Sequence, residues 1–189
     1  MHSRFAGVAA AALIVLAVVA CSPTAASSSA SAAPSAAPVA TSFADYQTAF
    51  CSSFTSLIRA VGNPDANTPS VMSKQLDDAV KAGNVAAAQR AAAAITAELE
   101  TGRRQAAIAA GWQPGVPSST ALDRVLLAFE ANIAARAATA APGASADPQA
   151  AFEHAGGVQA WTALLSSLST IPVPAGATPA PCKAFTGSI

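Results

Sequence analysis

Apolar residues recur three and four positions apart through most of the chain after residue 41, which is the spacing of amphipathic α-helices. The first such segment starts at Ser42, where Asp45 stands three positions later in a variant of the capping box, and it ends at Gly62-Asn63-Pro64. Its apolar stripe consists of Phe43, Tyr46, Phe50, Phe54, Leu57, Ile58 and Val61. We interpret it as a core-facing helix that carries most of the aromatic bulk.

Two further helices are predicted between residues 68 and 110. Thr68-Pro69 suits the N-cap and first position of a short helix that stops at Gly83, with Met72, Leu76, Ala79 and Val80 inward. Asn84 caps a longer helix, whose inward stripe is Val85, Ala88, Ala92, Ile95, Leu99, Gly102, Ala106 and Ala109. Because most of these side chains are small, we expect a neighbouring helix to approach closely.

A turn-rich segment, residues 111–117, separates these helices from the next one. Pro114-Gly115 within it suits the centre of a type II turn. Thr120 with Asp123 then offers a second capping box, opening a helix that ends by Pro142-Gly143. The predicted inward residues of this helix are Leu122, Val125, Leu126, Phe129 and Ile133.

The last predicted helix starts at Asp147-Pro148, and Gly156-Gly157 weakens its middle enough to split it. Its inward residues would be Phe152, Val158, Trp161, Leu164, Leu165 and Leu168. The tail contains Pro172, Pro174, Pro179 and Pro181 and is therefore expected to be irregular. With no strand pattern and short links between helices, the sequence predicts an all-α, antiparallel bundle of about four to five helices.

The N-terminal segment indicates where in the cell the protein is located. Met1 to Arg4 carries one fixed positive charge, and the apolar run from Val8 to Ala20, about 13 residues, is too short to span a membrane. Val18-Val19-Ala20-Cys21 resembles the lipobox of bacterial lipoproteins. That resemblance implies removal of residues 1–20 as a signal peptide and acylation of Cys21. The alternative is an ordinary signal peptide cut nearby, for which Cys21 would be incidental.

The lipoprotein interpretation divides the chain into three parts. After the signal peptide come residues 21–41, the lipidated cysteine and an uncharged Ala/Ser/Pro tract that cannot bury enough apolar surface to fold, which we interpret as a tether. Residues 42–189 form the helical domain. The expected location is the cell membrane or the outer membrane, with a lipid anchor and the domain on the extracytoplasmic side.

Cysteine usage gives a second prediction. With Cys21 acylated, the exported domain retains Cys51, in the first predicted helix, and Cys182, in the proline-rich tail. An oxidising compartment would join them in a disulfide that pins the tail to the bundle. A metal site would need more ligands than two cysteines, and the chain has no CxxC redox pair.

Composition and motifs indicate little chemistry. Ten basic and ten acidic residues balance, so there is no basic field for nucleic acid. His2 is lost with the signal peptide, which leaves His154 alone, either paired with Glu153 or solvated. The sequence contains no catalytic triad pattern, phosphate loop or metal-ligand spacing, so we predict no catalytic, cofactor-binding or metal-binding residues.

The remaining candidate surface lies around the 111–117 loop. Trp112 follows a helix-ending glycine and precedes Pro114-Gly115, so we expect it at one end of the bundle. It either folds down as a plug on the helix ends or stays exposed beside Arg103 or Arg104, offering a stacking surface to a partner. Arg103 and Arg104 are expected on a solvated face that balances Glu98 and Glu100.

Two functions from different classes fit these observations. The first is a non-enzymatic binding or scaffolding domain that is tethered to a membrane and contacts an unknown envelope protein or component. The second is a small-molecule-binding lipoprotein with its ligand between helices or under the Trp112 loop.

Overall fold

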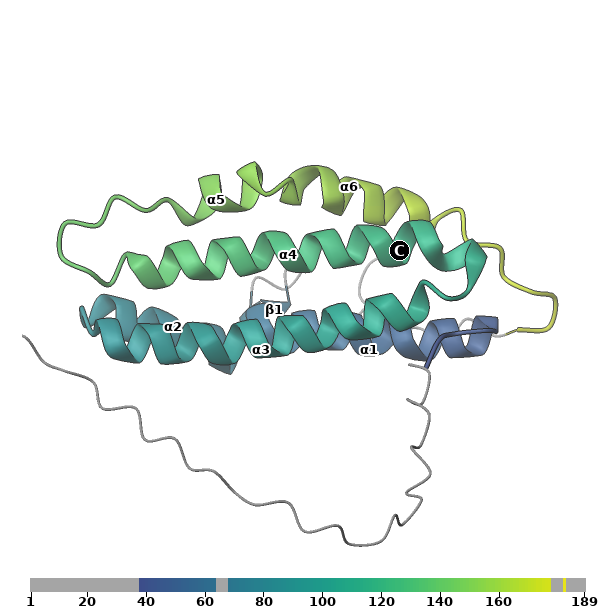
Figure 1. The fold of residues 1–189 in the computed structure, drawn as a ribbon, viewed down its shortest axis with the longest axis horizontal. Helices are drawn as coiled ribbons and strands as arrows, with labels where there is room; N and C mark the ends of the chain where they lie inside the picture. Colours follow the sequence, from purple (N-terminus) through teal and green to yellow (C-terminus); the bar gives the residue numbers. More distant parts are fainter. Residues whose placement is uncertain (1–37, 64–67, 178–181, 183–189) are drawn as a thin grey trace, which may run out of the picture. The chain divides into compact units, whose positions relative to one another are not determined.

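The computed structural model describes residues 38–63, 68–177 and 182, and these residues form six α-helices, a short 3₁₀ turn and one two-stranded sheet (Figure 1). The α-helices are α1 (Phe43–Val61), α2 (Val71–Lys81), α3 (Val85–Ala109), α4 (Val116–Ala138), α5 (Pro148–His154) and α6 (Gly157–Leu168). The strands are β1 (Gly62–Asn63) and β2 (Thr68–Pro69), and the 3₁₀ turn is η1 (Gln113–Gly115). The predicted antiparallel helical bundle is confirmed.

The helices are arranged as four rods, two of which are interrupted. The first rod is α1 followed by α2, the second is α3, the third is α4, and the fourth is α5 followed by α6 (Figure 1). The helix α3 packs against α1, α2 and α4, while α4 packs against α5 and α6 on its other side. The central pair, α3 and α4, therefore contributes to both halves of the core.

The core is built from the predicted stripes. Its fully buried large side chains come from five of the helices and are Leu57, Leu76, Ile95, Leu99, Leu122, Val125, Leu126, Ile133 and Leu164. Where α1 and α3 meet, a Cβ added to Gly102 would stand 3.2 Å from the Ser53 carbonyl oxygen and from the Ser56 Cβ. The small residues of α3 thus allow the close approach that the sequence predicts.

The helix starts at Ser42, Asn84 and Asp147 are confirmed, because each of these side chains accepts a hydrogen bond from a backbone N–H of the first turn. The predicted start at Thr68-Pro69 is wrong. Those residues form β2, which pairs antiparallel with β1, and Ser70 caps α2 instead. The prediction that the chain has no strands is therefore also wrong for residues 62–63 and 68–69.

The start of α4 also differs from the prediction. It begins at Val116, four residues before Thr120, and Pro117 stands in its first turn, where the missing N–H removes no hydrogen bond. Gly115 has φ of −90° and closes a 3₁₀ turn, so the predicted type II turn, which requires a positive φ at this position, is wrong.

The split at Gly156-Gly157 is confirmed, because Gly156 adopts the left-handed conformation, with φ of 78°, between α5 and α6. Because of this break, the residues of α6 that face the core differ from those predicted for one continuous helix. Ala160 and Leu164 face inward in α6, whereas Val158 and Leu165, which were predicted to be inward, are each 50% exposed.

Both ends of the domain are fastened to the bundle. Ala40, assigned above to the tether, is buried, and its N–H donates to the Ile108 carbonyl at 2.9 Å, so the packed domain begins before Ser42. Residues 1–37, which include the predicted signal peptide and most of the predicted tether, lie outside the described residues. At the other end, the predicted disulfide joins Cys51 on α1 to Cys182, with their Cα atoms 5.0 Å apart.

Candidate functional site

Trp112 lies half-buried between the end of α3 and the start of α4, and it packs onto α1. Its ring centroid is 5.3 Å from that of Phe43 and 5.1 Å from that of Tyr46. Gly115 is needed beneath it, because a Cβ there would overlap the Tyr46 ring. This is the geometry that the plug interpretation expects, although its contribution to stability stays a prediction.

Hydrogen bonds hold the same loop on α1. The buried hydroxyls of Tyr46 and Ser118 are 2.8 Å apart, and the Ser118 hydroxyl donates to the Gly115 carbonyl at 2.9 Å. Burial raises the pKa of Tyr46, against a smaller lowering effect of the Ser118 hydrogen bond. Tyr46 thus stays a neutral hydrogen-bonding group that fixes the loop.

Arg103 extends from α3 to the carboxylates of α4. Its Nε donates to Asp123 Oδ1 at 2.9 Å, and its Nη1 is 3.7 Å from Glu130 Oε1. Burial acts to lower the pKa of Arg103, but Asp123 and Glu130 outweigh it and raise the pKa. Glu100 also acts to raise the pKa of Arg103, more weakly than Asp123 and Glu130, so the main partners of Arg103 are these two residues of α4 rather than the expected Glu98 and Glu100.

Glu130 is the least solvated member of this cluster. Burial raises the pKa of its carboxyl, and the nearby Arg103 opposes that rise. The cluster as a whole ties α3 to α4 across their packed faces. It leaves Arg103 without a free charge for a ligand.

Arg104, the neighbour of Arg103, is exposed and points along its own helix. Its Nη2 donates to Thr101 Oγ1 at 2.8 Å, and Arg104 forms no ion pair within the part of the chain that the structure describes. Trp112 contacts α1, so the structure does not bring together the three residues of the predicted surface. Only Arg103 and Arg104 share a site.

That site is a hollow of about 540 Å³ between the second half of α3 and the first turns of α4, which we call the α3–α4 hollow. Its lining combines charged side chains with small ones: Glu100, Arg103, Arg104, Ala106, Ala107, Ala110, Ser119, Thr120 and Asp123. Ser119 is 1% exposed, and its hydroxyl has no hydrogen-bond partner. Sequence reasoning assigned Thr120 to a helix cap and did not single out Ser119, because it placed the start of α4 too late.

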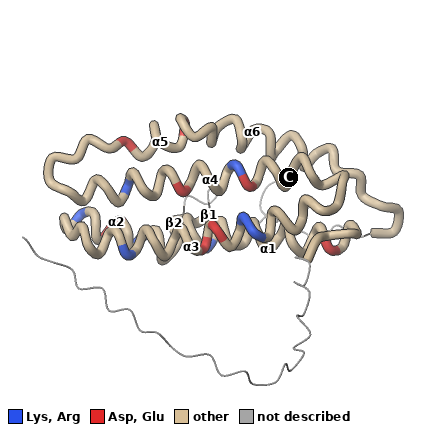
Figure 2. The backbone as a smooth tube through the Cα atoms, in the orientation of Figure 1, with Lys and Arg blue, Asp and Glu red and all other residues tan. Residues whose placement is uncertain are grey.

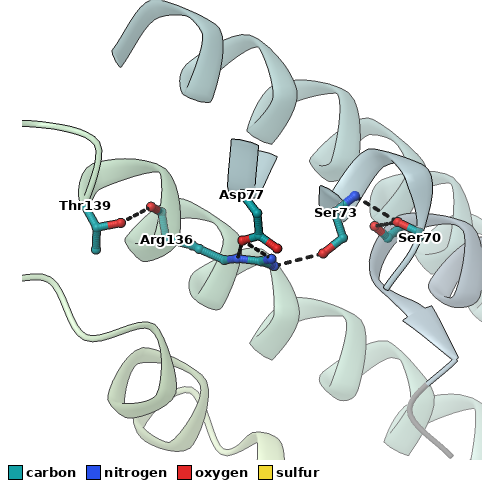
Figure 3. A network of polar contacts seen from close by, with 6 residues as sticks. Ser70, Ser73, Asp77, Arg136 and Thr139 are labelled. Carbon is teal, nitrogen blue, oxygen red and sulfur yellow. Dashed lines mark hydrogen bonds and ion pairs between the residues drawn. The ribbon is translucent and has the colours of Figure 1, made fainter. Parts of the chain in front are cut away.

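A second polar cluster, at the other end of α4, is structural. Arg136 donates through Nε to Asp77 Oδ1 at 2.9 Å and through Nη1 to the Ser73 hydroxyl at 3.0 Å (Figure 3). Ser70 extends the network, since its hydroxyl accepts from the Ser73 N–H and donates to the Ala60 carbonyl. The cluster connects α1, α2 and α4.

The other candidate groups stand apart from these clusters. His154 is exposed at the end of α5, and Glu153 accepts a hydrogen bond from Gln149 rather than from His154. Among the residues that the structure describes, no three histidine, cysteine or acidic side chains are grouped as metal ligands would be. Charged residues of both signs are spread along α1 to α4, whereas α6 has none (Figure 2).

None of the described helices combines the length and the apolar character needed to cross a membrane. No protein-family model matches this chain, and comparison with curated proteins and with solved structures finds no significant match. The functional argument therefore starts from the residues of this chain alone.

Proposed function

We propose that this chain is an exported lipoprotein whose helical domain binds or scaffolds an envelope component on the extracytoplasmic side of a membrane. The observation that carries the proposal is the Cys51–Cys182 disulfide. Structural disulfides form and persist in oxidising compartments and are rare where thiols are kept reduced. The lipobox-like sequence ending at Cys21 agrees with export to such a compartment and would provide a lipid anchor through acylation of Cys21.

Acylation would determine how the domain meets its partners. Two or three acyl chains, at about 0.8 kcal/mol per buried methylene, hold a protein firmly on a bilayer, whereas one chain does so only marginally. The tract after Cys21, about 20 residues long, would then give the domain a reach on the order of 25 Å. Binding near the membrane surface follows from this arrangement.

A second candidate function, the binding of a small ligand between helices, is favoured by the α3–α4 hollow. Its volume of about 540 Å³ lies in the range of small-molecule sites. Both functions are forms of binding and neither requires the protein to be an enzyme.

The anchor is tested by the Cys21→Ala variant expressed in a bacterial host that processes lipoproteins. Loss of the acylated thiol should move the protein from the detergent phase to the aqueous phase in a Triton X-114 partition. The double variant Cys51→Ala/Cys182→Ala is the matched control and should stay in the detergent phase, because it leaves Cys21 intact. A Cys21→Ala protein that partitions like the wild type would contradict the anchor.

A further inference from the structure

A second hollow, of about 360 Å³, lies between α1 and α3, and we call it the α1–α3 hollow. Its described lining comes from both helices and, apart from the disulfide-bonded cysteine, is polar: Cys51, Ser52, Thr55, Ser56, Arg59, Glu98, Thr101 and Gln105. No aromatic side chain is among these described lining residues. The volume lies in the range of small-molecule sites, and the lining favours a polar ligand.

The alignment of α1 and α3 gives the order of the groups along this hollow. The two helices run antiparallel, and a Cβ added to Gly102 would stand 3.2 Å from the Ser56 Cβ (Figure 1). Counting outward from this contact places Arg59 opposite Glu98 at one end and Gln105 near the other end. The lining residues of α1 span eight steps along the helix, a rise of about 12 Å. The hollow is therefore long enough for one small ring with its substituents.

The Ser56 hydroxyl is the central polar group of the hollow. Ser56 is only 5% exposed, and its hydroxyl forms no hydrogen bond with any described group. The hydroxyls of Ser52 and Thr55, by contrast, donate to carbonyls of their own helix. Unlike the Ser53 hydroxyl, that of Ser56 is not closed off from solvent by the fold. Because buried polar groups are nearly always paired, a hydroxyl that is unpaired yet reachable indicates a ligand in the hollow.

Two charged side chains and an amide provide the other binding groups. Arg59 is exposed and Glu98 is half-buried, and neither forms an ion pair within the part of the chain that the structure describes. Gln105 is half-buried and offers both a donor and an acceptor, as the Ser56 hydroxyl does. The hollow thus presents one cationic donor, one anionic acceptor and two groups of mixed character, without net charge.

We propose that the α1–α3 hollow binds a neutral ligand with several hydroxyl groups, such as a monosaccharide. One hydroxyl of a neighbouring pair on the ring donates to the Glu98 carboxylate, and the other accepts from the Arg59 guanidinium. Such hydrogen bonds to charged groups are the stronger ones. Ser56 and Gln105 bind further hydroxyls along the hollow. This inference goes beyond the functions proposed above, because it assigns a ligand class to a separate site and does not depend on the anchor.

The direct test is isothermal titration calorimetry of the full chain in a detergent without sugar groups. The probes are glucose, galactose and mannose, with cyclohexanol as a six-membered ring that carries one hydroxyl. Glycine carries both charges but no hydroxyl and tests the alternative of a zwitterion between Arg59 and Glu98. Saturable binding of at least one hexose, at least about tenfold tighter than that of cyclohexanol or glycine, is expected, because losing one hydrogen bond to a charged group weakens binding by about that factor.

Variants of the charged residues assign the two ends of the contact. Arg59→Gln and Glu98→Gln should each weaken hexose binding about tenfold. Arg90→Gln and Glu153→Gln are the matched controls and should leave it unchanged, because both residues are exposed and lie outside the hollow.

A third variant tests the buried hydroxyl. Ser56→Ala should weaken hexose binding about fivefold without lowering the melting temperature of the free protein, since this hydroxyl has no partner within the described fold. Ser53→Ala is its control, because the Ser53 hydroxyl is also unpaired but is closed off from solvent.

The proposal is overturned if none of the three hexoses gives saturable heat, if cyclohexanol or glycine binds as tightly as the best hexose, or if the Arg59, Glu98 and Ser56 variants bind like the wild type. Circular dichroism melting of each variant checks that it is folded. None of these results bears on the anchor, whose failure would appear only in the partition of Cys21→Ala. The two proposals can therefore fail separately.

Discussion

At the residue scale, the few aromatic side chains of this protein determine how one end of the bundle is closed. Only 5% of the residues are aromatic, and Phe43, Tyr46 and Trp112 gather at one end of the bundle. Alanine supplies most of the apolar content but little burial per residue. Closing that end therefore depends on a few rings.

Trp112→Ala should lower the free energy of unfolding by about 3 kcal/mol, toward the low end of the range for such a change because Trp112 is half-buried. Urea denaturation measures this decrease. In a Trp161→Phe background, Trp112 emission should be blue-shifted and protected from quenchers. Red-shifted, readily quenched emission with unchanged stability would reject the plug and favour a binding surface.

At the element scale, the sequence predicts where a helix starts when only one residue can act as its N-cap. It fails where a tertiary contact involves the candidate N-cap residues. Ser42 and Asn84 are correct N-caps because each stands directly before its apolar stripe, and Asp147 is one because Pro148 after it suits the first helical position. The second helix fails this test, since Thr68-Pro69 pairs with residues 62–63, a tertiary contact that local propensity cannot reveal. Its cap, Ser70, also bonds α1.

The candidate site was predicted only in part, for a related reason. Arg103 and Arg104 could be identified as an adjacent basic pair, but their partners depend on how α3 and α4 are aligned. The partners of Arg103, Asp123 and Glu130, are 20 and 27 positions away in sequence. No periodicity in one helix indicates which residues of another lie opposite it.

The Arg136–Asp77 contact that joins α4 to α2 gives a prediction at this scale. A double-mutant cycle with Arg136→Gln and Asp77→Asn should give a coupling energy of about 1 kcal/mol, because both side chains are partly exposed, at 24% and 34%. Asp78→Asn, an exposed neighbour, serves as the control and should change stability little. A coupling energy of zero would show that the network does not hold α2.

At the scale of the whole molecule, the chain forms a bundle whose first and fourth rods are broken and whose tail is pinned back to the first. The disulfide closes a loop of 131 residues, from α1 to beyond α6. In the chain-entropy model, a loop of this length stabilises the fold by roughly 5 kcal/mol, an upper figure. The bond therefore fastens Cys182, in the C-terminal tail, to α1.

The double variant Cys51→Ala/Cys182→Ala should lower the free energy of unfolding by about 2–5 kcal/mol, the range usual for a native disulfide in a small exported domain. Urea denaturation of the oxidised wild type and of the variant measures the difference. The wild type in reductant should be destabilised by a similar amount. Equal stability of all three samples would mean that the tail contributes nothing to the fold.

The central claim is that this is an exported, lipid-anchored and disulfide-bonded bundle, and mass spectrometry of the unreduced protein from host membranes tests it most directly. We predict an N-terminal peptide that starts at Cys21 and carries the mass of attached acyl chains, together with a linked pair of peptides containing Cys51 and Cys182. A mature chain that starts elsewhere, with an unmodified Cys21 or with free thiols at Cys51 and Cys182, would contradict the account.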